Sequence, residues 1–206
     1  MKSIAFINQK GGSGKTTLAV HMAVAAQEDG ENVALIDTDP QQSATVWSNT
    51  RENDNPIVAT VTPLDIDNVL EAAKSDGITL AIIDTAPHAA PQASRIAKAV
   101  DLAVVPCRPT AFDLAAISSV VDIIKAAGIP AVFILSACPT RAMEIAETRQ
   151  VLSEQYDYPI APVYITDRRA FARAVATGRA VTEFESTGKA AEEIRLLWNW
   201  IREKIA

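Results

Sequence analysis

The sequence is poor in cysteine and in aromatic residues, and it has no long hydrophobic run. Its two cysteines, Cys107 and Cys138, are too few and too far apart for a zinc or iron–sulfur framework, so we interpret them as core thiols. No apolar stretch approaches the ~20 residues that span a bilayer, and the residues after Lys2 do not have the form of a signal peptide. We therefore expect a soluble, cytoplasmic protein with reduced thiols.

The sequence also lacks an excess of basic residues. Its 25 acidic and 19 basic residues give a net charge of −6, which excludes a surface coated in positive charge but not a local basic patch. The length of 206 residues suits one α/β domain with a full-sized core. Because no internal repeat or low-complexity linker appears, we expect residues 1–206 to form a single domain.

Short apolar runs alternate with longer helix-patterned segments along the whole chain. Runs rich in Val, Ile and Leu without polar alternation predict buried parallel strands. Their alternation with helices is typical of a doubly wound α/β fold, with helices on both faces of a mostly parallel sheet. The expected strands are 3–8, 32–37, 80–84, 102–106, 131–136 and, with a weaker pattern, 160–165. The expected helices are 15–29, 41–49, 65–75, 89–98, 111–127, 143–155, 168–177 and 189–205.

A glycine-rich segment, Asn-Gln-Lys-Gly-Gly-Ser-Gly-Lys-Thr-Thr at residues 8–17, follows the first expected strand and opens a helix. In such a phosphate-binding loop, glycines let backbone N–H groups turn inward, and the helix N-terminus adds partial positive charge. Lys15 is expected to reach the β- and γ-phosphates of ATP, Thr16 to place its hydroxyl on Mg²⁺, and Thr17 to contact the α-phosphate. The other expected nucleotide-binding residues of the loop are Gly11, Gly12, Ser13 and Gly14.

The loop departs from the strict motif, because Gln9 stands where that motif has a glycine and Lys10 follows it. The segment from Lys10 to Thr17 resembles the deviant Walker A motif of the ParA/MinD ATPases, P-loop NTPases with a second, signature lysine. This resemblance implies a weak, partner-stimulated ATP hydrolase that forms an ATP-bound homodimer, in which Lys10 crosses to the partner's nucleotide. A cation supplied in trans stabilises charge on the transferring phosphoryl group, so both Lys10 and Lys15 are expected to be catalytic.

Aspartates lie at the ends of two further expected strands. The segment Asp37-Thr38-Asp39-Pro40-Gln41 resembles the Asp-x-Asp-Pro-Gln segment of the same family. On that match, Asp39 is the catalytic residue that positions or activates the attacking water, and Asp37 supports the Mg²⁺ shell. Asp84 ends an apolar run as a Walker B aspartate does, and it is expected to reach Mg²⁺ through water. The alternative for each aspartate is that it only caps the helix that follows.

Later segments resemble small ParA-type (ParF-like) partition proteins. These are residues 105–113 at a strand end, residues 165–169 near the adenine, and residues 188–194 at the start of the closing helix. Arg168 is accordingly expected to bind the nucleotide. ParA-type proteins bind DNA without sequence preference in the ATP state, and a ParB-like or ribbon–helix–helix centromere-binding partner stimulates hydrolysis. The resemblance therefore implies segregation of plasmid or chromosomal DNA by a protein associated with the nucleoid.

The distribution of charge allows such a DNA contact. Residues 168–204 hold eight basic and five acidic residues, whereas the rest of the chain holds 11 basic and 20 acidic ones. Concentrated basic charge is what sequence-independent phosphate contact requires. The alternative is an ordinary solvated helix of mixed charge. The expected DNA-binding residues are Arg168, Arg169, Arg173, Arg179 and Lys189.

Three other functions are alternatives to DNA partition. The last helix has an apolar stripe that could lie in a lipid interface, as in a MinD-like membrane switch. Such a stripe more often closes the core, and nothing follows this helix, so membrane binding is not expected. A ParA-like ATPase could instead position a protein cargo, and no residue separates the two cargoes. The third alternative is a metabolic enzyme of the same fold. A dethiobiotin synthetase-like ligase would not need Lys10, and a nitrogenase-reductase-like electron donor needs paired cluster cysteines, whereas the residues that flank Cys107 and Cys138 differ from that pattern.

Overall fold

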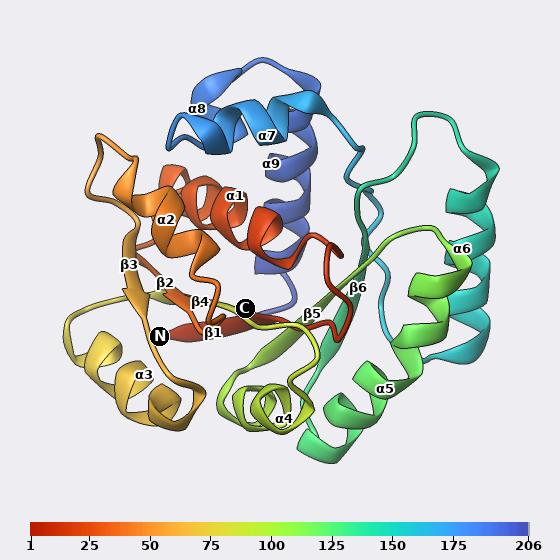
Figure 1. The fold of residues 1–206 in the computed structure, drawn as a ribbon, viewed down its shortest axis with the longest axis horizontal. Coiled ribbons are helices and arrows are strands. Elements are labelled where there is room, and N and C mark those ends of the chain that lie inside the picture. The colour runs from red at the N-terminus through yellow and green to blue at the C-terminus, as the bar shows by residue number, and fades with distance from the viewer. Residues whose placement is uncertain (206) are drawn as a thin grey trace.

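The computed structural model, which describes residues 1–205, has a six-stranded parallel sheet at its centre (Figure 1). The strand order is β3-β2-β4-β1-β5-β6. Every residue of β2, β4, β5 and β6 is buried, which explains why these strands appear in the sequence as unbroken apolar runs. The strands are β1 (Lys2–Phe6), β2 (Val33–Asp37), β3 (Ile57–Thr60), β4 (Leu80–Asp84), β5 (Leu102–Cys107) and β6 (Ala131–Leu135).

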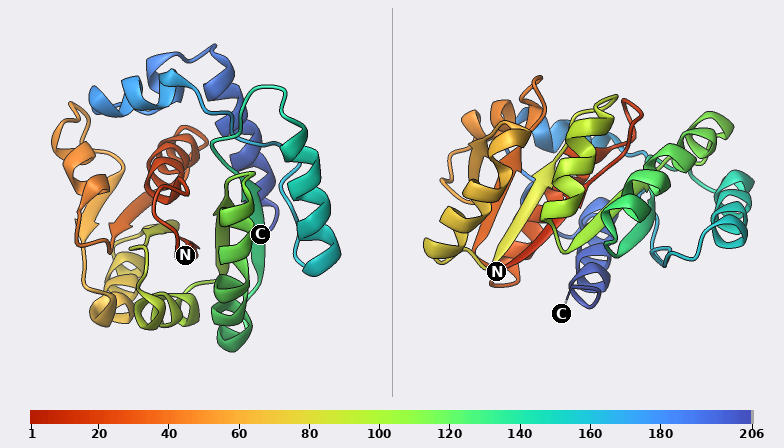
Figure 2. Two further views of the ribbon diagram at one scale, coloured as in Figure 1. Left: turned by 45° about the vertical axis from the view of Figure 1, so that its right-hand side comes forward. Right: turned by 90° about the horizontal axis from the view of Figure 1, so that it is seen from below.

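Helices cover both faces of this sheet (Figures 1 and 2), which confirms the doubly wound α/β fold. Alternate residues of β1 point to opposite faces, so Ile4 and Phe6 join one apolar core, while Ala5 and Ile7, which follows the strand, join the other. One face carries α1 (Lys15–Glu28), α2 (Ser43–Asn49), α7 (Arg169–Ala176), α8 (Val181–Phe184) and α9 (Lys189–Arg202). The other carries the 3₁₀ turn η1 (Pro63–Asp65), α3 (Ile66–Ser75), α4 (Ala90–Ala99), α5 (Ala111–Ala127) and α6 (Met143–Gln155).

The apolar stripe of α9 closes the first core. Ile194, Leu197 and Ile201 are fully buried in the same cluster as α1, and α9 packs against α1. The Trp198 indole nitrogen donates to the Asp29 carboxylate at the end of α1, 2.9 Å away. The stripe is therefore occupied within the fold. Within the described residues, no helix combines the length and the apolar character needed to cross a membrane.

The strand expected at residues 160–165 is wrong. This segment runs beside β6 but makes only isolated bridges, Phe133 to Ile160 and Cys138 to Thr166. Pro162 lies in the middle of the segment and has no N–H to donate, so a continuous ladder cannot form there. The edge strand β3 and the short α8 were not expected from the sequence. Ile57 at the start of β3 is 52% exposed, so this strand lacks the buried pattern of the others.

Register brings the carboxyl ends of three strands together. Phe6 of β1 pairs with Asp84 of β4, and Asp84 also pairs with Asp37 of β2. The loop that follows β1 therefore lies beside both aspartates, at the edge of the sheet where doubly wound folds bind their ligands. Cys107 at the end of β5 and Cys138 after β6 are buried free thiols, and burial raises the pKa of each to about 12.

Candidate nucleotide-binding site

The glycine-rich loop is anchored at both of its ends. The Asn8 side chain donates to the Pro106 carbonyl oxygen at 2.6 Å and accepts from the Lys10 N–H at 2.8 Å. The Ser136 hydroxyl, just beyond β6, donates to the Ser13 carbonyl oxygen at 2.7 Å. Gly14 immediately precedes α1 with φ of 95°, a left-handed conformation that favours glycine. The loop is thus held open around the N-terminus of α1.

All of the predicted phosphate-binding residues of the loop except Ser13, which is fully buried, line a pocket of about 220 Å³. A Cβ built on Gly11 or Gly12 meets no atom within 4 Å, so open space lies beside the loop backbone. Lys15 is buried, and its ammonium donates to the Lys10 carbonyl oxygen at 3.3 Å. Burial lowers the pKa of Lys15, while the carboxylates of Asp84 and Asp39 oppose that shift. The pocket is lined by Gly11, Gly12, Gly14, Lys15, Thr16, Thr17, Asp39 and Pro87.

Asp84 is a deeply buried carboxylate at the end of β4. Its side chain is fully buried, and neither carboxylate oxygen has a hydrogen-bond partner of good geometry among the described residues. Burial raises the pKa of Asp84 to about 7, and the nearby Thr16 hydroxyl and Lys15 ammonium counteract this increase. Hydroxyl and carboxylate oxygens are the ligands that Mg²⁺ prefers, alone or through water. Thr16 and Asp84 therefore fit a magnesium ion at this position.

Asp37 and Asp39 have different surroundings. Asp37 is fully buried, and its two oxygens accept from the Asp39 N–H at 3.1 Å and from the N–H and hydroxyl of Thr45 at 2.9 and 3.0 Å. These bonds tie the end of β2 to the first turn of α2. Asp39 is half-buried, and its side chain lines the phosphate pocket. The geometry thus gives Asp37 a supporting position behind Asp39; its role toward Mg²⁺ stays a prediction.

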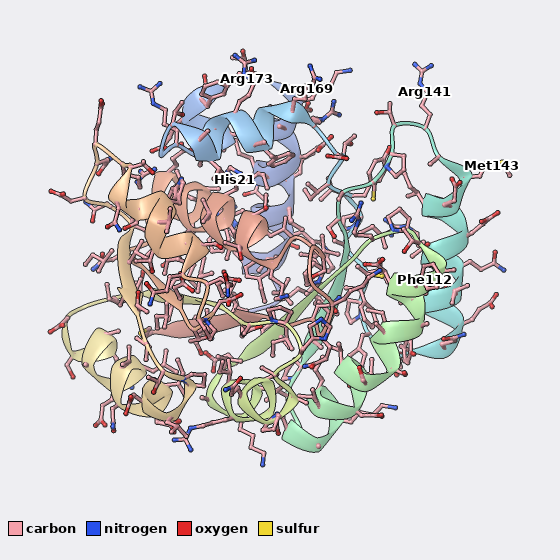
Figure 3. The ribbon with its side chains drawn as sticks, viewed as in Figure 1. His21, Phe112, Arg141, Met143, Arg169 and Arg173 are labelled. Carbon is pink, nitrogen blue, oxygen red and sulfur yellow. The ribbon has the colours of Figure 1, made fainter. Side chains whose placement is uncertain are left out.

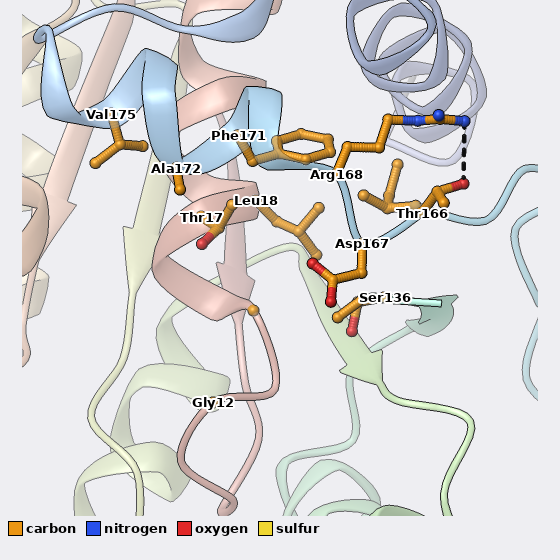
Figure 4. A pocket seen from close by; sticks show the side chains of 13 residues that line it. Gly12, Thr17, Leu18, Ser136, Thr166, Asp167, Arg168, Phe171, Ala172 and Val175 are labelled. Carbon is orange, nitrogen blue, oxygen red and sulfur yellow. Dashed lines mark hydrogen bonds between the residues drawn. The ribbon is translucent and has the colours of Figure 1, made fainter. Parts of the chain in front are cut away.

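A second pocket, of about 300 Å³, opens beside the loop (Figure 4). Arg168 lies at its rim, where the guanidinium donates to the Glu193 carboxylate of α9 at 2.7 Å and to the Thr166 hydroxyl at 3.4 Å. Thr166 donates its own N–H and hydroxyl to Glu193. Phe171 of α7 and Leu18 of α1 supply apolar walls. An apolar slot with a few polar groups, next to a phosphate loop, suits a nucleotide base.

Sequence reasoning predicted Arg168 here but not Glu193 or Phe171. Phe171 lies outside the segments that carry the resemblance, and Glu193 lies in the segment 188–194 but had no role predicted there. The packing of α7 and α9 beside the loop brings both residues to the site. The Arg168 side chain, paired with Glu193, is only 29% exposed. This limited exposure favours the predicted nucleotide contact of Arg168 over its predicted DNA contact.

Lys10 has an unpredicted partner within its own chain. Its ammonium forms an ion pair with the Asp113 carboxylate in the first turn of α5 and lies 6.0 Å from the centre of the Phe112 ring. Thr110 caps the same helix, because its oxygen accepts from the Asp113 N–H at 3.2 Å. A threonine followed three residues later by an aspartate is a helix-start signal that the sequence does contain.

The remaining predicted DNA-binding residues are exposed on one side of the molecule. Arg169 and Arg173 project outward from α7 (Figure 3), while Arg179 follows that helix and Lys189 begins α9. Arg173 is partly engaged, since it lies 3.6 Å from the Glu185 carboxylate and stacks over Phe184. Figure 3 also shows the exposed Arg141, which the sequence reasoning did not include. The DNA contacts stay predictions.

The fold and the loop together define a P-loop nucleotide-binding protein. Residues 4–181 match the model of the CobQ/CobB/MinD/ParA nucleotide-binding domain, and the chain belongs to this family of deviant Walker A ATPases. It is 29% identical over 210 residues to the maintenance of carboxysome distribution protein A of Gloeobacter kilaueensis, with 98% of this chain and 93% of that protein covered. It is 26% identical to the protein IncC of Escherichia coli, with 100% of this chain and 70% of that protein covered.

Solved structures agree with this assignment of the fold. The septum site-determining protein MinD of Pyrococcus horikoshii, determined with Mg-ADP, superposes with a TM-score of 0.81 at 17% identity, over 98% of this chain and 96% of that one. At this level of identity the likeness establishes the fold.

Proposed function

We propose that this protein is a ParA-type positioning switch that binds ATP and Mg²⁺, dimerises around two nucleotides and holds DNA non-specifically until hydrolysis releases it. The observation that carries the proposal is the pair of lysines that flank the glycine loop. Lys15 lines the phosphate pocket, whereas the Lys10 ammonium is directed away from that pocket to α5. A lysine placed in this way does not contact the phosphates of its own subunit, which is consistent with a role at the nucleotide of a second subunit.

Each residue of the site has its own role at the bound nucleotide. The loop N–H groups and Lys15 hold the phosphates, and Thr16 and Asp84 hold Mg²⁺, which neutralises phosphate charge when it is bound. Asp39 orients the attacking water, and Asp37 fixes the backbone of Asp39 through their 3.1 Å hydrogen bond. Lys10 of the partner subunit adds positive charge where negative charge develops during transfer.

The DNA contact follows from dimerisation. One subunit's exposed cations on α7 and α9 bind phosphates weakly, but a closed dimer presents twice as many, and release of counterions makes the affinity rise steeply. The contacts assigned here are Arg169, Arg173, Arg179 and Lys189, with Arg168 kept for the nucleotide.

A positioning switch of this kind is compatible with two cargoes, DNA and a protein assembly. Similarity over nearly the whole chain to a carboxysome-distribution protein and to IncC supports a positioning role with either cargo. We assign plasmid or chromosomal DNA as the cargo and a ParB-like or ribbon–helix–helix protein as the partner that stimulates hydrolysis. A nucleoid-associated location follows if the ATP-bound dimer coats chromosomal DNA.

The test is the binding of a random-sequence DNA duplex to protein with ATP, ADP or no nucleotide. Asp39→Ala should hold the ATP state and retain DNA, whereas Lys10→Ala should abolish binding. Lys125→Ala, an exposed lysine at the far end of α5, is the matched control and should bind as the wild type does. Equal binding in all three nucleotide states, or none in any, would refute the DNA role.

A second pair of variants tests the assigned surface. Replacing Arg169 and Lys189 together by alanine should weaken DNA binding and reduce its salt dependence by about two phosphate contacts per subunit, without changing ATP binding. An unchanged salt slope would show that the DNA lies elsewhere on the protein.

A further inference from the structure

The ion pair between Lys10 and Asp113 joins the phosphate loop to α5. The two residues are 103 positions apart in the sequence, so the fold and not local geometry brings them together. Lys10 is 34% exposed and Asp113 only 2%, so the lysine reaches inward to a carboxylate that solvent does not reach. The pair is therefore much better shielded than an ordinary surface ion pair.

Asp113 depends on this lysine for its charge balance. One carboxylate oxygen accepts from both Lys10 and the Thr110 hydroxyl, while the other is buried with no partner among the described residues. A buried carboxylate that loses its cation is strongly destabilising. Departure of Lys10 would leave Asp113 with only the Thr110 hydroxyl, so the carboxylate opposes that departure.

We propose that Asp113 is a positioning residue that stores Lys10 within its own subunit, and that the ATP-bound dimer forms only when Lys10 exchanges Asp113 for the phosphates of the partner's nucleotide. This inference rests on the function proposed above and concerns the regulation of the same site. The stored position is incompatible with the bridging one, because a single ammonium that pairs with α5 of its own subunit cannot also reach across an interface.

This exchange determines whether loss of the Asp113 charge strengthens or weakens dimerisation. Every dimer that forms in the wild-type protein must break the Lys10–Asp113 pair in both subunits. Asp113→Asn keeps the shape of the side chain and an oxygen that can accept from Thr110, but it removes the charge that retains the lysine. A hydrogen bond to a charged group stabilises a folded protein more than one between neutral groups, so loss of the Lys10–Asp113 pair should favour the dimer appreciably. We expect the variant to dimerise at a protein concentration at least roughly tenfold lower than the wild type requires.

The experiment is sedimentation of the full chain with Mg²⁺ and the slowly hydrolysed analogue ATPγS, over a range of protein concentrations. The matched control is Asp67→Asn, which breaks the exposed pair between Asp67 of α3 and Arg95 of α4 by the same chemical change. The control should dimerise as the wild type does, and Asp113→Asn should dimerise at lower concentration. Thermal unfolding of each variant checks that it is folded.

A second measurement examines the stored state without nucleotide. Trace acetylation with acetic anhydride, read by mass spectrometry relative to Lys125, reports how freely the Lys10 amine reacts. Release from Asp113 should make Lys10 react several-fold faster in Asp113→Asn than in the wild type, while Asp67→Asn leaves the rate unchanged.

The outcomes separate the two proposals. If the wild type dimerises and Asp113→Asn does so no better, or less well, the storage role is wrong and the proposed function stands. If neither protein dimerises at saturating ATPγS, the proposed function fails and the storage role fails with it. Tighter dimerisation together with faster acetylation, both confined to Asp113→Asn, is the result that we expect.

Discussion

His21 should make the stability of this protein fall as the pH is lowered below 6.5. The side chain is fully buried in α1, where its Nδ1 accepts from the Val181 N–H at 3.1 Å and its ring packs edge-on against Phe171. Burial lowers the pKa of His21 to about 3, although the Glu183 carboxylate opposes that shift. The imidazole is therefore neutral in the folded protein at any pH near neutrality, and it joins the nucleotide-loop helix to the start of α8.

The sign and the size of this change in stability follow from the linkage between proton binding and folding. Between pH 6.5 and about 3, the unfolded chain binds a proton at His21 that the folded chain does not, so lowering the pH favours unfolding. The contribution is complete above pH 6.5, declines through this window and is lost below it. At pH 5 the difference of about 1.5 pH units from the unfolded pKa corresponds to a loss of roughly 2 kcal/mol.

The assay is urea unfolding at pH 7.5 and pH 5, compared between the wild type and His21→Asn. Asparagine does not titrate, and its carbonyl oxygen can accept from Val181 in place of the imidazole nitrogen. Asp84 titrates in the same pH range, and because its pKa is raised in the folded protein, its protonation stabilises the folded state as the pH falls. The measured quantity is therefore the difference between the two proteins. Equal changes in the free energy of unfolding for both would refute the reasoning.

Two further predictions concern backbone geometry and the magnesium site. Gly178→Ala should reduce the free energy of unfolding by at least about 2 kcal/mol, because a Cβ there would lie 2.4 Å from the Thr50 carbonyl oxygen at φ of 67°. Gly30→Ala, with positive φ but no atom within 4 Å, should cost only about 1 kcal/mol in the same urea titration. Asp84→Asn should raise stability at pH 8 by roughly 1–4 kcal/mol, since it removes a buried, unpaired charge, and it should abolish the Mg²⁺ dependence of fluorescent ATP binding. Lower stability in Asp84→Asn would contradict the absence of partners for that carboxylate.

The sequence allowed the fold to be predicted where burial was complete. Four of the six strands are completely buried, β1 is buried except for Lys2, and each of these five was expected close to its observed place. The edge strand β3 was missed because it is only four residues long and none of its residues is fully buried, so its short apolar run does not stand out from the loop before it. The segment at 160–165 was overpredicted because its composition favours a strand, whereas one proline interrupts the hydrogen bonding.

The candidate site shows the same division between local and long-range information. The loop from Lys10 to Thr17 is contiguous, so its conformation could be expected from its own glycines and the helix that it opens. Asp113 and Glu193 could not be found in this way, because each meets its partner only after the sheet brings distant segments together. A capping signal at Thr110 marks a helix start, but nothing local indicates that a lysine of another element occupies the same carboxylate.

The charges at this edge of the sheet explain why assembly and nucleotide binding should be linked. Asp39 and Asp84 already act on Lys15, so one lysine offsets carboxylates as well as the phosphates it is expected to hold. Mg²⁺ compensates for part of that excess on the proposed mechanism. Lys10 contributes no positive charge to the phosphate pocket while it is paired with Asp113 of its own subunit. On the proposed mechanism, bound triphosphate attracts Lys10 of a second subunit, and that attraction must exceed the attraction between Lys10 and Asp113 of its own subunit. We therefore expect dimerisation to be sensitive to the number of phosphates on the nucleotide, because ADP carries less negative charge with which to compete against the same carboxylate.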